Sequence, residues 1–197
     1  MSLVLAQDAD ADAFLSSDPF ALLTGMLLDQ QIPMERAFAG PYSIATRLGV
    51  DRLDPAHIAA LGEEQFAAVL AEPPAVHRYP GSMAGRIQAL AREIVDSYGG
   101  DAATLWTTAD TGDELVSRLR ALPGFGAQKA QIFTALLGKQ LGIRPDGWRE
   151  AAGAYGQDGS RRSVADVTGP ESLTEVRAFK KALKAAAKSS ASASVRH

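Results

Sequence analysis

The chain has 197 residues, of which 46% are apolar, and it carries a formal net charge of -3 at pH 7. This length and apolar content are enough to bury a core, which excludes global disorder. The sequence has no cysteine and three scattered histidines, which excludes disulfides, thiol catalysis, iron–sulfur clusters and cysteine zinc sites.

Neither a membrane span nor a secretory leader is visible in the sequence. No apolar run approaches the roughly 20 residues of a spanning helix, and the short N-terminal apolar patch has no basic region before it. We therefore expect a monomeric cytoplasmic protein without a membrane partner. The net charge counts against coating nucleic acid by bulk charge, although it allows a protein that holds DNA through backbone amides and a local basic face.

Helix signals follow one another through the first half of the chain. Asp18-Pro19 places a capping side chain before a proline at the first helical position. Residues 82–98 are the clearest amphipathic segment, because apolar residues recur three or four positions apart and Gly99-Gly100 ends the pattern. In chain order, the helices expected in this half begin at Pro19, Pro33, Pro55, Glu63 and Ser82.

The second half is also mainly helical, and its helices are interrupted by a short central turn and by a later loop. The hairpin motif over residues 113–139 contains helical patterns over 113–121 and 127–139, separated by Leu122-Pro123-Gly124-Phe125-Gly126. No alternating strand pattern stands out, so we predict an all-α fold, an irregular globule of two helical lobes in a single domain, 1–197. Further along we expect a short helix near Asp146, a loop over 153–169, a last helix over 172–188 opened by a Ser-Leu-Thr-Glu capping box, and a frayed tail over 189–197.

Charge is distributed unevenly, because the chain contains no acid after Glu175. The basic end has two interpretations, a solvated helix face or a flank that faces DNA. Its basic residues are Arg177, Lys180, Lys181, Lys184, Lys188 and Arg196.

The segment between the two central helices has the chemistry of an anion-binding turn. Pro123 ends the first helix, because it lacks an amide hydrogen and its ring clashes with the preceding turn. Gly124 and Gly126 allow positive φ and a close approach of another backbone. The second helix starts at once, and its first amides are unpaired and carry the positive end of the helix dipole. Such a turn fits a phosphate and positions a nucleic acid without reading its bases.

The complete Leu-Pro-Gly-x-Gly hairpin resembles the helix-hairpin-helix motif. With helices on both sides, it resembles the superfamily of base-excision DNA glycosylases of the endonuclease III and alkylpurine glycosylase kind. Residues 27–32, Leu-Leu-Asp-Gln-Gln-Ile, resemble the family's Leu-Leu-x-x-Gln segment, and the paired glutamines are more like the alkylpurine branch. Residues 78–84 resemble the loop and helix start that precede the long helix before the hairpin. The resemblance covers residues 18–155.

This resemblance implies roles for individual residues. Gln30 and Gln31 would lie near the lesion and the gap left by a flipped base. Asp146, which follows Gln128 by 18 residues, would be the catalytic aspartate. The residues implied to bind the DNA backbone are Leu122, Gly124, Phe125, Gly126, Gln128 and Lys129.

A carboxylate at Asp146 would have a defined task in such an enzyme. Cleavage of a C1′–N bond passes through an oxocarbenium-like transition state, which a carboxylate stabilises directly or by activating water. The target nucleotide must first leave the base stack and enter a pocket. The alternative interpretation is that Asp146 only caps the helix that follows. Four aromatic residues are candidates for lining the pocket or packing in the core: Phe38, Tyr42, Trp106 and Trp148.

Two departures from the family narrow the predicted activity. The position at which bifunctional members carry the Schiff-base lysine holds Gln128, and Lys129 lies about 100° further round the helix. Lys129 would reach a phosphate or be solvated. The flanks of Asp146 also differ, with Pro145 before it, Gly147 after it and no histidine. We expect no cofactor and no metal, apart from a monovalent cation that the resemblance implies at the hairpin.

Three functions remain open on the sequence alone. The first is a monofunctional DNA N-glycosylase that acts on double-stranded DNA with a damaged base and leaves the strand intact. The second is a catalytically inactive helix-hairpin-helix protein that binds damaged or distorted DNA. The third is a helical interaction protein in which the hairpin merely joins two helices.

Overall fold

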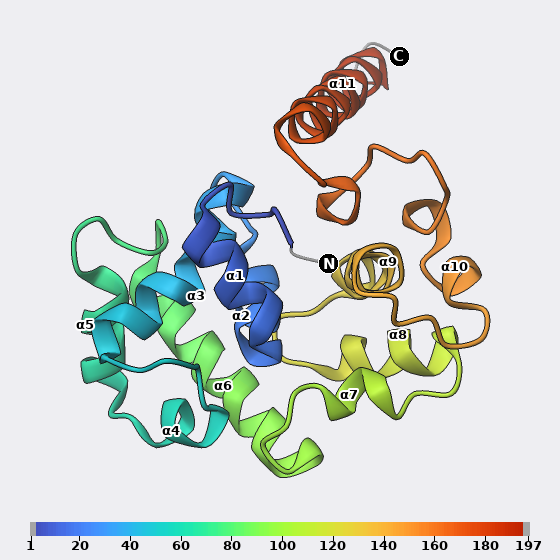
Figure 1. The fold of residues 1–197 in the computed structure, drawn as a ribbon. Coiled ribbons are helices and arrows are strands. Elements are labelled where there is room, and N and C mark those ends of the chain that lie inside the picture. Colours follow the sequence, from blue (N-terminus) through green and yellow to red (C-terminus); the bar gives the residue numbers. More distant parts are fainter. Residues whose placement is uncertain (1–2, 195–197) are drawn as a thin grey trace.

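The computed structural model describes residues 3–194, and the side chains of residues 3–186. This part of the chain is mainly helical and contains no strand, only an isolated bridge between Thr111 and Asp146. The predicted all-α fold is confirmed (Figure 1).

The first half forms six helices whose starts follow the predicted capping chemistry. The side chains of Asp8, Asp18 and Asp54 each accept a backbone N–H from the first helical turn. The α3 and α6 helices end at Gly49 and Gly99, which are left-handed. The first of the six helices was not predicted. The bounds are α1 Ala9–Ser17, α2 Pro19–Leu28, α3 Met34–Leu48, α4 Pro55–Ala60, α5 Glu63–Ala71 and α6 Pro80–Tyr98.

The second half contains the predicted pair of central helices, a short helix after them and a long terminal helix. The predicted loop over 153–169 is irregular apart from two short 3-10 turns. A short helix before the central pair, α7, was not predicted. The bounds are α7 Thr104–Thr107, α8 Gly112–Ala121, α9 Ala127–Gln140, α10 Trp148–Ala151, η1 Gly153–Tyr155, η2 Val164–Asp166 and α11 Pro170–Ser194.

The helices pack in two groups that share the buried helix α2. In the first group α1 and α2 pack on α3, and α4 and α5 pack on α6. In the second group α8, α10 and η2 pack around α9. Every residue of α2 except Pro19 is buried, and one apolar cluster extends from Leu27 of α2 to Phe133 of α9. Figure 1 shows α1 and α2 between α3 and α9.

The terminal helix α11 begins earlier and ends later than predicted. It starts at Pro170, because proline is favoured at the first helical position, so Ser172 lies inside the first turn. The Ser172 hydroxyl accepts the backbone N–H groups of Thr168 and Gly169 instead of opening a capping box. The helix continues to Ser194, and residues 195–197 of the predicted tail lie outside the described residues.

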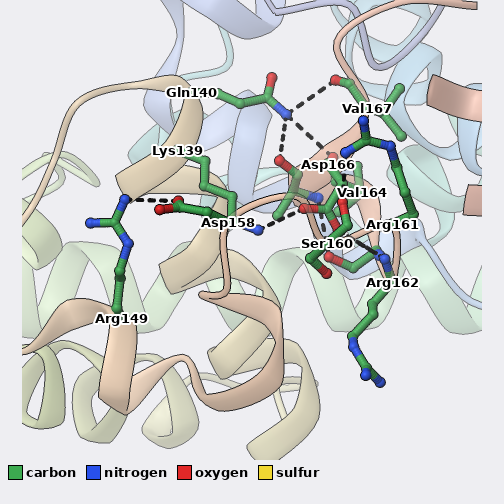
Figure 2. A network of polar contacts seen from close by, with 12 residues as sticks. Lys139, Gln140, Arg149, Asp158, Ser160, Arg161, Arg162, Val164, Asp166 and Val167 are labelled. Carbon is green, nitrogen blue, oxygen red and sulfur yellow. Dashed lines mark hydrogen bonds and ion pairs between the residues drawn. The ribbon is translucent and has the colours of Figure 1, made fainter. Parts of the chain in front are cut away.

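A polar network fixes the turn that leads into α11. The buried amide Nε2 of Gln140 donates to the carbonyl oxygens of Ala165 and Val167, at 2.9 and 3.1 Å. Beside it, Lys139 forms an ion pair of 2.6 Å with Asp166, whose side chain is only 3% exposed. Figure 2 shows both contacts joining the end of α9 to η2. Since α11 follows η2 directly, this network sets where α11 begins.

Within residues 3–194, no helix combines the length and the apolar character needed to cross a membrane. In the same part of the chain, no group of three or more His, Asp or Glu side chains is placed to hold a metal ion.

Candidate functional site

The hairpin between α8 and α9 uses its two glycines differently. Gly124 has a φ of +81°, in the left-handed region that favours glycine. Gly126 has a φ of -91° and a ψ of 179°, which any residue adopts, and a Cβ there would meet no atom within 4 Å. The expectation of positive φ is therefore confirmed for Gly124 and wrong for Gly126. The open space at Gly126 fits the other predicted use of glycine, a close approach by another backbone.

The apolar residues of the hairpin anchor it to the core. Leu122 and Phe125 are 3% and 5% exposed, and the Phe125 ring packs edge-on against Phe133. Gly124 and Gly126 are exposed. The prediction of DNA contacts is therefore corrected for the side chains of Leu122 and Phe125, because burial removes them from the surface. Their packing leaves the backbone of the two glycines facing solvent.

The first turn of α9 has backbone N–H groups that no side chain described in the structure caps. The N-cap is Gly126, which has no side chain to cap the helix, and no other side-chain cap is present among the described residues. The first hydrogen bond of the helical pattern is donated by the backbone N–H of Ala130 to the carbonyl oxygen of the N-cap residue, Gly126. The amides before it point out of the helix start, where the helix dipole is positive.

A cavity of about 450 Å³ lies next to this first turn. Its walls come from the end of α2 with the residues after it, the start of α9, the segment between α10 and α11, and α11. The residues that line it are Met26, Asp29, Gln30, Gln31, Ile32, Gln128, Lys129, Ile132, Tyr155, Arg162, Phe179, Lys180 and Leu183. Four of the predicted site residues, Gln30, Gln31, Gln128 and Lys129, are thus brought together.

Lys129 closes one wall of the cavity. Its Nζ donates to the carbonyl oxygens of Met26 and Leu27, at 2.7 and 2.9 Å, and so satisfies the C-terminal end of α2. Burial lowers the pKa of Lys129 to about 8, against the opposing attraction of Asp29. The alternative of a solvated Lys129 is therefore wrong.

Asp29 is the one carboxylate among the described residues that line the cavity. It is the C-cap residue of α2, and its backbone N–H donates to Gly25. Burial raises the pKa of the Asp29 carboxyl, while the positive charges of Lys180 and Lys129 act against the rise. A carboxyl with a raised pKa in a cavity is suited to proton transfer.

The paired glutamines differ in how firmly the surrounding residues hold them. Gln30 is fixed from several sides: its amide donates to the carbonyl of Leu27, its Oε1 accepts from Arg86, and its own carbonyl oxygen lies 2.8 Å from the ring of the buried His77. Gln31 is exposed and has a φ of +60°, which is uncommon for a residue other than glycine. The strained Gln31 at the cavity is therefore the better candidate for a residue that moves or contacts a ligand.

The opposite wall includes three residues that the sequence did not single out as a site, Tyr155, Arg162 and Phe179. The Gln128 amide donates to the Tyr155 hydroxyl at 2.9 Å. On the α11 side, the Arg162 guanidinium lies 5.1 Å from the centre of the Phe179 ring. The first contact joins α9 to η1, and the second joins the segment before η2 to α11, so both lie in the wall formed by the second half of the chain.

Asp146 does not line this cavity. It pairs with the start of α8, where its carbonyl accepts the N–H of Gly112 at 2.7 Å. The neighbouring Trp148 packs on Gly138, near the end of α9 opposite to the hairpin. The alternative role as a helix cap is wrong, because the N-cap of α10 is Gly147 and no side chain caps that helix. Asp146 is exposed.

The aromatic candidates belong mainly to the core. Phe38, Trp106 and Trp148 are 0%, 5% and 6% exposed, and Tyr42 packs against Phe14. None of these four lines the cavity described above.

Comparisons of the chain with protein families, with curated proteins and with solved structures found no match. The residues that sequence reasoning missed at the cavity are chiefly Asp29 and Lys180. Asp29 stands directly beside the two glutamines, and Lys180 belongs to the basic run after Glu175, so each lay within a segment already noted. Only the position of α11 at the cavity, opposite the residues that follow α2, brings their charges near one another.

Proposed function

We propose that the protein is a monofunctional DNA N-glycosylase, which binds duplex DNA at the hairpin and hydrolyses the N-glycosidic bond of a damaged base. One observation carries this proposal. The first turn of α9, which directly follows the Leu-Pro-Gly-x-Gly turn, and the Gln30-Gln31 segment are far apart in the sequence but border the same cavity, and that cavity contains a carboxylate. A backbone-binding turn beside a pocket of nucleotide size is the arrangement that an enzyme acting on a flipped nucleotide requires.

In this proposal Asp29 takes the catalytic role that the sequence assigned to Asp146. A glycosylase needs a carboxylate near C1′, to stabilise the developing oxocarbenium ion or to accept a proton from the attacking water. Asp29 lines the cavity, whereas Asp146 lies outside it. Burial raises the pKa of the Asp29 carboxyl, and a raised pKa favours proton transfer by a carboxyl group.

The contacts of Lys129 support hydrolysis without strand cleavage. A Schiff base requires an unprotonated amine that is free to approach the sugar. The Lys129 amine instead donates to two carbonyl oxygens at the end of α2. The neighbouring Gln128 has no amine. The expected products are a free base and an abasic site in an intact strand.

A second candidate is the catalytically inactive DNA-binding protein. It is favoured by the position of Asp146, because the carboxylate that the family resemblance implies lies outside the cavity. In that case the cavity would hold a flipped nucleotide without cleaving it.

The test is base release from duplexes that each carry one deaminated, oxidised or alkylated base. We expect release by the unaltered protein, a loss of ~100-fold or more in Asp29→Asn, and little change in the control Asp146→Asn. Circular dichroism checks that both variants fold, and a gel shift measures DNA binding.

Each alternative has its own outcome in this test. Release that is lost in Asp146→Asn and kept in Asp29→Asn overturns the role of Asp29. Binding without release from any duplex supports the inactive protein. Absence of binding to every duplex overturns the proposal of a DNA partner.

A further inference from the structure

The cavity carries an excess of positive charge. Among the described residues that line it, Lys129, Lys180 and Arg162 are basic, and Asp29 alone is acidic. A fourth cation, Arg86, acts on Lys129 from beside Gln30. A ligand in this space therefore meets more positive than negative side chains.

Two of these cations are held in place by the protein. Lys129 is fixed by the carbonyl oxygens of Met26 and Leu27, and Arg162 lies over the Phe179 ring. Lys180, on the next position of α11, is close enough to Asp29 to affect the pKa of its carboxyl. Because these positions are set before a ligand arrives, the positive field is a built property of the cavity.

Several of the hydrogen-bonding groups that line the cavity have the same bias, beside the acceptor oxygens of Asp29 and of the two glutamines. Lysine and arginine only donate hydrogen bonds, and the Tyr155 hydroxyl already accepts from Gln128, so its own hydrogen remains to be donated. Donors that face a ligand are best matched by carbonyl oxygens. A base on which a carbonyl replaces an amino group supplies such an oxygen.

We propose that the cavity selects neutral damaged bases with added carbonyl oxygens, and rejects bases made cationic by alkylation of a ring nitrogen. This inference rests on the proposed glycosylase function. Deaminated and oxidised bases share this chemistry. The paired glutamines resemble the alkylpurine branch, but a cationic alkylpurine would be placed among like charges. Like charges at short distance disfavour binding in a partly desolvated site.

The test compares two duplexes that differ in the charge of one base. One duplex contains 7-methylguanine, which is cationic, and the other contains its neutral isostere 7-methyl-7-deazaguanine. A 2′-fluoro sugar at that position in both prevents cleavage, so equilibrium binding is measured. We expect the neutral base to be bound at least about tenfold more tightly at low salt.

Two variants on α11 distinguish the effect of positive charge in the cavity from the effect of positive charge on the exposed surface. Lys180→Met removes a cation that lines the cavity and should reduce the difference between the two duplexes. Lys181→Met removes an exposed cation outside it and should weaken both duplexes equally. Parallel base-release assays with hypoxanthine, uracil and 8-oxoguanine distinguish deaminated from oxidised bases as the source of the carbonyl.

The outcomes distinguish this inference from the proposed function. Equal binding of the two duplexes, or tighter binding of the cationic base, overturns the charge selection and leaves DNA binding intact. An unchanged difference in Lys180→Met also overturns it. Failure to bind either duplex overturns the proposed function itself.

Discussion

The side chain of Leu27 lies directly against the backbone of Gly124. A Cβ added to Gly124 would be 2.4 Å from Leu27 Cδ1, and Leu27 is fully buried. This contact joins the hairpin to the end of α2, whose last carbonyl groups are bound by Lys129. The turn proposed to bind DNA and one wall of the cavity are therefore parts of one packed unit.

Gly124→Ala should destabilise the fold. Alanine would be strained at a φ of +81° and its methyl group would overlap Leu27. We expect a loss of about 1–3 kcal/mol in the free energy of unfolding, measured by urea denaturation. Unchanged stability would show that the turn adapts without cost.

Gly126→Ala should weaken DNA binding without changing the stability of the fold. Its backbone is extended and the added methyl group would enter open space, so the free energy of unfolding should not change. The same methyl group would keep a phosphate away from the first amides of α9. Because hydrogen bonds to charged groups are strong, we expect about tenfold weaker DNA binding or more. Unaltered affinity would remove this turn from the DNA interface.

The ion pair between Lys139 and Asp166 should be needed for stability. Lys139→Met leaves the buried Asp166 carboxylate without its cation, although two backbone N–H groups of the segment before η2 still donate to it, at a cost of roughly 3 kcal/mol in the free energy of unfolding. The control is Asp158→Asn, which removes an exposed pair with Arg149 and should leave the urea midpoint unchanged. Equal effects of both variants would contradict the importance of burial.

Lys129 should make stability rise with pH above neutrality. Its pKa is about 8 in the folded chain and 10.5 when unperturbed, so between these values the unfolded chain binds more protons. Raising the pH through this window therefore favours the folded state, by about 1.4 kcal/mol per pH unit at most. Below pH 8 the lysine is protonated in both states and adds no slope.

The measurement is the free energy of unfolding from pH 7 to 10 for the unaltered protein and for Lys129→Met. Methionine does not titrate, so the difference between the two proteins should grow in favour of the unaltered chain as the pH rises. Parallel curves would contradict the burial of the Lys129 ammonium.

Most helices could be predicted because their signals are local. Aspartate caps, prolines at helix starts and terminal glycines act within one turn, and they located α2 to α6 and both helices of the hairpin. Helix α1 was missed because its apolar pattern is interrupted by Asp12. That side chain is buried, and its Oδ1 accepts the N–H of Ala6 at 2.7 Å. A hydrogen bond from the segment just before the helix thus allows a buried aspartate to interrupt the apolar face.

The candidate site was predicted only in part, because distance along the chain is not distance in space. Asp146 follows the hairpin at the expected spacing, but α9 has 14 residues and extends about 21 Å away from it. The chain returns to the cavity only at Tyr155. Asp29 and Lys180 acquire their roles from packing between segments about 150 residues apart, which no local pattern reveals.

The hydrogen bond from Lys129 to Met26 joins residues 103 positions apart, and the last wall of the cavity reaches Leu183. The hairpin, in contrast, is complete when α9 ends at Gln140. During synthesis, the roughly 43 residues between these points take about 2–9 s to add. A nascent chain therefore presents the hairpin for seconds before α11 exists to complete the cavity.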